Sequence, residues 1–205
     1  MQDSFQNKVS LMKYINQLEY RNLLYPTTLE RDAPLCAPYP SVAEAGCGLC
    51  CACMMINQLT KKQLSVQQCI DLAIKAGANR FGTDLGLLGN ALASRYNLAM
   101  QVTDSMTQLT NCLRLGGCAV ANVGGDRRGY QGVLSCGGHF VLVSKIDRDK
   151  VWILDPAYTE EKYQKPHRRV VTEIQGDYVV TRLVVLEEDT RSRSPAFYLF
   201  TCVCS

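Results

Sequence analysis

The sequence predicts an α+β protein in which N-terminal helices pack on a mostly antiparallel sheet. Apolar residues at helical spacing dominate the first half of the chain, whereas β-rich runs separated by turns dominate residues 116–205. Such segregation of helices from strands is typical of the α+β class. The 205 residues are enough for one well-buried domain and few for two, so we expect a single domain over residues 1–205.

The first 115 residues are expected to be largely helical. Residues 1–40 should contain a helix over 8–24 and a proline-rich loop up to Pro40. Residues 41–115 form the helical half, with helices expected over 47–58, 66–76, 85–96 and 105–115 and a short strand over 98–103. Helix-capping signals support these boundaries, namely Ser65, Thr83 or Asp84 at starts and Gly77, Asn97 and Gly116 at ends.

Residues 116–205 form the half that is expected to build the sheet. Its β-rich runs cover residues 118–123, 139–146, 151–155, 169–174, 178–187 and 196–203. The turns between them contain glycine and aspartate, which favour chain reversal.

Composition excludes several classes of protein. The net charge of +3 is spread without a basic stripe, so no nucleic-acid partner is expected. No apolar run approaches the roughly 20 residues of a membrane span, so no membrane partner is expected either. The count of 11 cysteines is odd and many are adjacent, which does not fit a disulfide framework. With no apolar signal-type segment near Met1, we expect a reduced, cytoplasmic protein.

Cys47 is the candidate nucleophile. It stands directly after Gly46, at the start of a predicted helix. Unpaired N–H groups and the positive dipole end at a helix N-terminus favour thiolate over thiol, and the thiolate is the reactive form. The alternative is that Cys47 is one of several small core residues on a helix rich in cysteine, alanine and methionine.

His139 and Asp155 complete the candidate site. His139, one of two histidines, begins an apolar strand after Gly137 and Gly138, and Asp155 ends the next apolar strand. A hairpin that turns near residues 147–149 would bring the two side by side. A carboxylate beside a histidine fixes its tautomer and stabilises its charged form. Cysteine, histidine and aspartate in this order form the papain-type arrangement, with the histidine as base and the aspartate orienting it.

The sequence resembles the C39-like cysteine peptidases of bacteria. The resemblance rests on AGCGLCCACMMIN (45–57), FGTDLGLLGNALASRYNL (81–98), LRLGGCAVANVGG (113–125), GGHFVLVSKIDRDKVWILDP (137–156) and AFYLF (196–200). It implies a papain-like fold and a hydrolase that acts on a peptide or protein through a thioester, without cofactor or metal. Papain-like enzymes often carry an oxyanion-stabilising glutamine six residues before the nucleophile. Ser41 occupies that position here, so Ser41 and Tyr39 are the candidate oxyanion donors.

Three alternatives compete with the peptidase hypothesis. Cys47 and Cys50 form a C-x-x-C motif, but no buried strand precedes it as in thioredoxin-like redox proteins. Cys47, Cys50, Cys136 and His139 have the pairwise spacing of a structural zinc site, which would make Asp155 incidental. A papain-like binding module with a weak or dead active site is the third, and the absence of the usual glutamine favours it.

Overall fold

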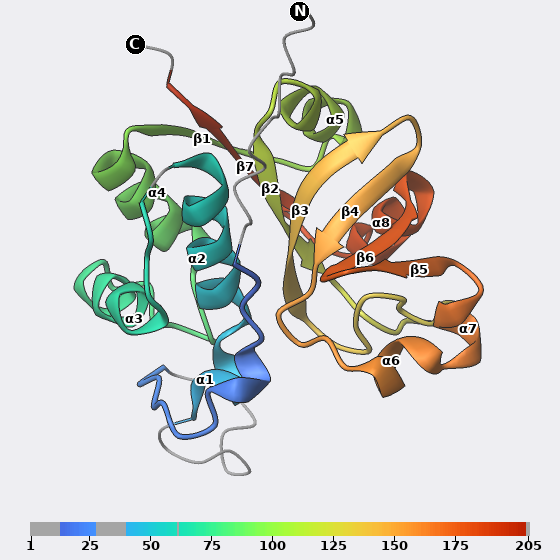
Figure 1. Cartoon of the computed structure of the whole chain (residues 1–205), viewed down its shortest axis with the longest axis horizontal. Coiled ribbons are helices and arrows are strands. Elements are labelled where there is room, and N and C mark those ends of the chain that lie inside the picture. The colour runs from blue at the N-terminus through green and yellow to red at the C-terminus, as the bar shows by residue number, and fades with distance from the viewer. Residues whose placement is uncertain (1–12, 28–39, 61, 204–205) are drawn as a thin grey trace, which may run out of the picture.

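One antiparallel sheet of seven strands forms the centre of the protein (Figure 1). The computed structural model describes residues 13–27, 40–60 and 62–203. The strand order is β1-β7-β2-β3-β4-β6-β5. The strands are β1 (Leu98–Thr103), β2 (Cys118–Val123), β3 (His139–Asp147), β4 (Lys150–Leu154), β5 (Thr172–Gln175), β6 (Tyr178–Arg182) and β7 (Phe197–Cys202).

Helices surround this sheet in two groups. They are the 3₁₀ helix η1 (Gln17–Glu19) and the α-helices α1 (Val42–Ala45), α2 (Cys47–Leu59), α3 (Val66–Lys75), α4 (Leu85–Tyr96), α5 (Met106–Arg114), α6 (Glu160–Gln164), α7 (Pro166–Arg169) and α8 (Leu183–Thr190). Figure 1 shows α1–α4 gathered on the left, and β3–β6 with α6–α8 on the right. Helices α1–α4 precede all seven strands of the sheet in sequence, and the predicted α+β class is confirmed.

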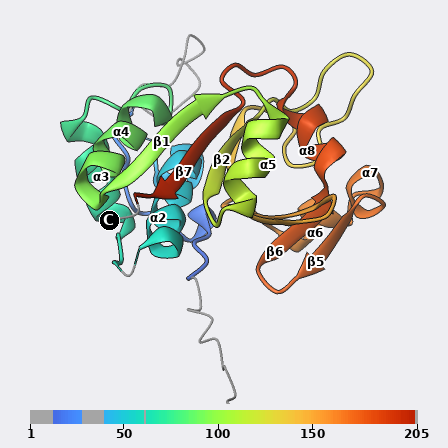
Figure 2. The same ribbon diagram turned by 90° about the horizontal axis from the view of Figure 1, so that it is seen from above.

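The two faces of the sheet bury different cores. Val120 and Leu142 pack with the residues of α2, α3 and α4, while Val141 and Val143 pack with those of α5 and α8. Side chains alternate between the faces of a strand, so neighbouring residues of β3 serve the two cores in turn. Figure 2, seen from above, shows the central strands with α2 and α5 at their sides. The strand pair β2–β3 is therefore covered on both faces.

The helices predicted between residues 47 and 115 are confirmed. Ser65 and Ser105 cap α3 and α5 through their side chains, and Asp84 rather than Thr83 caps α4. Asn97 ends α4 in the left-handed conformation, at φ 54°. These ends follow local chemistry, because a capping side chain satisfies the free N–H groups of its own helix.

The expected helix over residues 8–24 is wrong for the part that the structure describes. Residues 13–24 contain only the short η1 helix, and residues 8–12 lie outside the described residues. The N–H of Gln17 donates to Pro156 O at 2.7 Å, and Tyr14 Oη donates to Asp155 O at 2.6 Å. Bonds to a distant loop thus replace helical bonds.

Two expected strands are partly wrong. The run 178–187 is a strand only to Arg182, after which residues 183–190 form α8. Leu186 is fully buried whereas Val184 is exposed, which is a helical pattern of burial. The unbroken run of apolar residues in the sequence does not reveal this pattern. The run 169–174 likewise begins as the end of α7 and becomes β5 only at Thr172.

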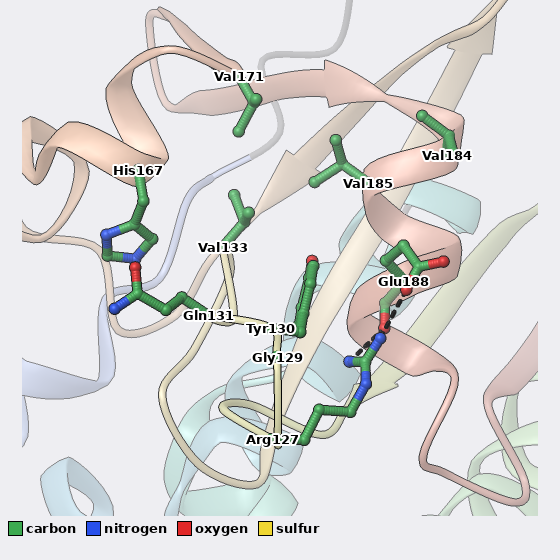
Figure 3. Close-up of a pocket in the computed structure, with 10 residues that line it drawn as sticks. All are labelled: Arg127, Gly129, Tyr130, Gln131, Val133, His167, Val171, Val184, Val185 and Glu188. Carbon is green, nitrogen blue, oxygen red and sulfur yellow. Dashed lines mark hydrogen bonds and ion pairs between the residues drawn. The ribbon is translucent and has the colours of Figure 1, made fainter.

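A surface pocket of about 600 Å³ lies between the loop 124–138, α7 and α8. Figure 3 shows Val133, Val171 and Val185 around it, with Arg127 paired to Glu188 at its rim. None of Cys47, His139 and Asp155 lines this pocket. It is therefore separate from the site described next.

Candidate active site

The first turn of α2 presents Cys47. Gly46 is the N-cap residue, and a Cβ there would lie 2.4 Å from Val42 Cγ1, so only glycine fits the junction between α1 and α2. A Cβ at Gly48 would lie 2.8 Å from Thr83 Cβ, so glycine also lets α2 pack closely on the segment that leads into α4. Cys47 is partly exposed, whereas Cys50 and Cys51 are fully buried.

The β3–β4 hairpin brings His139 and Asp155 together. His139 is the first residue of β3, and Asp155 follows the last residue of β4. The hairpin register pairs Leu142 with Leu154. The imidazole Nε2 of His139 lies 2.7 Å from Asp155 Oδ1, and both side chains are buried.

The thiol of Cys47 lies close enough to the His139 side chain for each group to shift the pKa of the other. Because Asp155 occupies Nε2, the ring nitrogen left for Cys47 is Nδ1. Burial raises the pKa of Cys47, but the hydrogen bond and charge of His139, with the amides of Phe140 and Gly48, outweigh it and lower this pKa. Burial lowers the pKa of His139, but Asp155 and Cys47 outweigh it and raise this pKa to about 9. The site favours a thiolate–imidazolium pair.

Asp155 is held as an anion by four donors. Its Oδ1 accepts from Ala157 N at 2.9 Å as well as facing His139, and its Oδ2 accepts from Lys162 Nζ at 2.5 Å and Tyr163 Oη at 2.7 Å. Burial raises the pKa of Asp155, but His139 and Lys162 overcome it and hold the pKa well below its usual range. A buried carboxylate stays ionised only with such partners.

Lys162 and Tyr163 are members of the site that the sequence did not reveal. They lie on α6, where the Thr159 side chain caps the helix by accepting from Lys162 N. The cap residue Thr159, four residues after Asp155, is the signal in the sequence that could have indicated this helix. This cap predicts the helix but not that the Lys162 side chain points toward Asp155.

The segment before α1 joins the two halves of the site. Gln17 is buried, donates its side-chain Nε2 to Ala43 O at 2.8 Å and its backbone N–H to Pro156 O. Ala43 belongs to the helix before Cys47, and Pro156 follows Asp155. Gln17 thus links the nucleophile segment to the carboxylate segment.

Of the two candidate oxyanion donors, the structure describes only Ser41. Ser41 is the N-cap residue of α1, and its Oγ and backbone N–H both donate to Glu44 Oε2, at 2.9 and 2.7 Å. Its hydroxyl proton is therefore committed to a capping box. Tyr39 lies outside the described residues.

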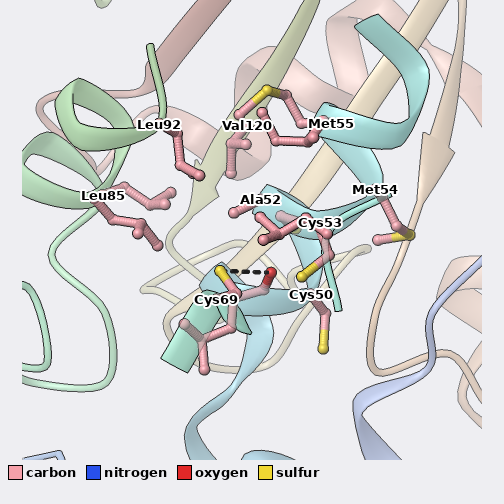
Figure 4. Close-up of a cluster of buried hydrophobic side chains, with 14 of the residues drawn as sticks. Cys50, Ala52, Cys53, Met54, Met55, Cys69, Leu85, Leu92 and Val120 are labelled. Carbon is pink, nitrogen blue, oxygen red and sulfur yellow. Dashed lines mark hydrogen bonds between the residues drawn. The ribbon is translucent and has the colours of Figure 1, made fainter. Parts of the chain in front are cut away.

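The remaining cysteines of α2 differ from Cys47 in chemistry. Figure 4 shows Cys50, Cys53 and Cys69 among buried methionine and leucine side chains. Burial raises the pKa of Cys50 and Cys51, and a hydrogen bond from Cys53 to Cys69 together with burial raises that of Cys53. Only one thiol on this helix is therefore biased toward thiolate.

The grouping considered for zinc is not assembled among the described residues. No cluster of three or more metal-binding side chains occurs in residues 13–27, 40–60 and 62–203. His139 uses Nε2 for Asp155, Cys50 is fully buried and Cys136 is exposed. The histidine thus belongs to a carboxylate–imidazole–thiol chain.

We expect Lys162→Met to raise the pKa of His139 by roughly half a unit or more. The ammonium group neutralises part of the Asp155 charge, so its removal lets the carboxylate attract the imidazolium more strongly. The measurement is a ¹³C NMR titration of the two histidine rings, with His167→Gln assigning the signals. Lys162→Arg keeps the cation and should not shift the pKa. Tyr163→Phe removes a neutral donor to the same Oδ2 and should shift it less. An unmoved midpoint in Lys162→Met would contradict this electrostatic role.

In the described part of the chain, no helix combines the length and apolar character that a bilayer crossing requires.

Comparisons with known proteins bear on this arrangement. The sequence profile of the peptidase C39 family matches residues 39–169. A crystal structure of a C39-like peptidase from Bacillus anthracis superposes with a TM-score of 0.59 at 13% identity, covering 96% of this chain and 98% of that one. A double glycine motif protease of an AMS/PCAT transporter, solved with its leader peptide, gives a TM-score of 0.46 at 16% identity, covering 90% and 95%. No curated protein sequence matches the chain.

Proposed function

The chain belongs to the peptidase C39 family, and from that premise we propose that it is a cysteine peptidase. In this proposal it cleaves peptide or protein substrates through a thioester on Cys47. His139 moves the proton, and Asp155 orients the imidazole and keeps it charged. No metal or cofactor takes part in the steps below.

One observation carries the proposal: the buried hydrogen bond between His139 and Asp155, with the Cys47 thiol beside the same imidazole. The imidazole bonds to a fully buried carboxylate at 2.7 Å, and the imidazole lowers the pKa of the neighbouring Cys47 thiol. A lowered thiol pKa next to a raised imidazole pKa is the combination that makes a nucleophile and a proton donor available together.

In the acylation step the Cys47 thiolate attacks the carbonyl carbon of the scissile amide. The C–S bond forms, and the carbonyl electron pair moves onto oxygen. As the oxyanion collapses, the C–N bond breaks and the imidazolium of His139 gives its proton to the leaving nitrogen. The products are an amine and a thioester on Cys47, with a neutral imidazole.

In the deacylation step a water molecule attacks the thioester carbon while His139 accepts its proton. Collapse of the second oxyanion breaks the C–S bond and releases a carboxylic acid. The thiolate–imidazolium pair is restored, and the sum of both steps is hydrolysis of one amide bond.

Backbone amides at the start of α2 are the proposed oxyanion donors. The amides of a first helical turn have no partner within their own helix, and Cys47 is the first residue of that turn. The commitment of the Ser41 hydroxyl to Glu44 leaves the backbone as the better-supported source.

Thiol alkylation tests the proposal. At about pH 6, Cys47 should react with iodoacetamide faster than every other cysteine, because an ordinary thiol is almost fully protonated there. Mass spectrometry of the digested protein identifies the alkylated residue. Peptides from a digested proteome should also be cleaved by the untreated protein and spared after alkylation. Preferential labelling of another cysteine, or cleavage that survives full alkylation of Cys47, would refute the proposal.

A further inference from the structure

We propose that Arg193 binds a carboxylate of the substrate on the leaving-group side of the scissile bond. This inference rests on the proposed function and deepens it by naming a substrate class. The carboxylate belongs either to an acidic side chain or to the free C-terminus, within about two residues of the cleaved amide.

Arg193 lies against the backbone that leads into His139. A Cβ on Gly138 would lie 2.6 Å from Arg193 Nη2, and a Cβ on Gly124 would lie 3.5 Å from Arg193 Nε. Val123 pairs with His139 at the end of the β2–β3 ladder, and Gly124 and Gly138 lie directly beyond that pair in the chain. The guanidinium therefore covers this glycine pair, one residue away from the imidazole.

The guanidinium has no counter-ion among the described residues. Arg193 takes part in none of the ion pairs or side-chain hydrogen bonds of residues 13–27, 40–60 and 62–203, and its Nε is buried without a partner. Burying part of a charged group without a partner costs free energy. A partly buried guanidinium without a counter-ion is therefore expected to bind an anionic ligand.

The acidic residues of the neighbouring loops are already committed. Asp104 accepts from Ser194 Oγ and Ala196 N, each at 2.8 Å. Asp189 accepts from Tyr130, Val133 and Leu134. Glu188 pairs with Arg127 and Arg191. These bonds hold the loops in place and leave Arg193 as a cation available to an incoming anion.

The position of Arg193 assigns the side of the scissile bond. The acyl carbon bonds to Cys47, whereas the leaving nitrogen takes its proton from His139, so the leaving group runs past the imidazole. Gly138 is exposed and adjacent to His139. A leaving-group residue that passes the glycine pair would meet the guanidinium, whose planar fork matches a carboxylate.

The test uses peptides from a digested proteome and synthetic pairs made from the cleaved sites. Each pair differs only by aspartate against asparagine in the first two leaving-group positions, or by a free C-terminus against a C-terminal amide. The two kinds of pair distinguish the two sources of carboxylate. We expect wild type to favour the acid of at least one kind of pair by about tenfold in kcat/KM, the size of one charge-assisted hydrogen bond.

Arg193→Gln should bring that ratio close to one, and Arg193→Lys should retain part of it. Arg114→Gln, on the exposed end of α5, removes the same charge elsewhere and should leave the ratio unchanged. Thermal unfolding of each variant verifies that it is folded. If Arg193→Gln does not fold, the ratio measured for Arg193→Lys tests the inference instead. An equal ratio in wild type and Arg193→Gln would overturn the inference while leaving the peptidase proposal intact. A wild-type protein that cleaves no peptide would instead overturn both.

Discussion

Cys47→Ala is expected to reduce peptide cleavage by about 10⁴-fold or more and to abolish alkylation at about pH 6. The substitution removes the sulfur atom that is proposed to form the thioester. It should leave the fold intact, because Cys47 is partly exposed and stands in the first turn of α2. The measurements are cleavage of proteome-derived peptides, mass-spectrometric mapping of iodoacetamide adducts and thermal unfolding.

Cys50→Ala is the matched control for this prediction. Cys50 lies one turn further along α2, is fully buried and has a raised pKa. Its replacement should lower the free energy of unfolding by about 1–2 kcal/mol but keep cleavage and labelling. If alkylation at about pH 6 persists in Cys47→Ala on Cys50 or Cys53, the nucleophile has been assigned to the wrong residue.

His139→Ala is expected to cost about 10²-fold or more in cleavage rate, and more than Asp155→Asn. Without the imidazole, the thiolate loses the partner that lowers its pKa, and the leaving nitrogen has no proton donor. Labelling of Cys47 should then require a higher pH, because burial alone raises the pKa of its thiol. Rates of cleavage and of iodoacetamide labelling, each followed against pH, measure both effects.

Asp155→Asn separates orientation from proton transfer. An asparagine oxygen can still accept one set of donors, either Lys162 and Tyr163 or His139 and Ala157, but it carries no charge. The imidazole remains able to move a proton, although its pKa should fall because the anion that raises it is gone. Equal rates for wild type and His139→Ala would contradict a catalytic role for His139 and favour the alternative of a papain-like binding module.

Local interactions explain which elements of the fold could be predicted from the sequence. The helices α3, α4 and α5 have a capping side chain at the start of a short-range apolar pattern, so their signals lie within a few residues. The failures fall where tertiary contacts replace local ones. Residues 13–24 bond to the loop after Asp155, and the start of α8 donates Leu183 N to Asp149 O at 2.6 Å.

The three residues proposed for catalysis could be found in the sequence because each has a local mark. Cys47 follows a glycine at a helix start, His139 follows two glycines at a strand start, and Asp155 ends the next apolar run of the sequence. A single short hairpin determines that His139 and Asp155 meet, and the register of a hairpin follows from its turn.

The sequence by itself therefore determined the α+β class, the order of most elements and the three residues that are proposed to carry the chemistry. Only the tertiary structure decided that Lys162 and Tyr163 hold the Asp155 carboxylate, that Gln17 links Ala43 to Pro156, and that Arg193 covers the glycines beside His139. Each of these contacts depends on the direction of a side chain relative to another segment. No local periodicity encodes that direction, because it is set by how α6, η1 and the loop before β7 pack on the finished sheet.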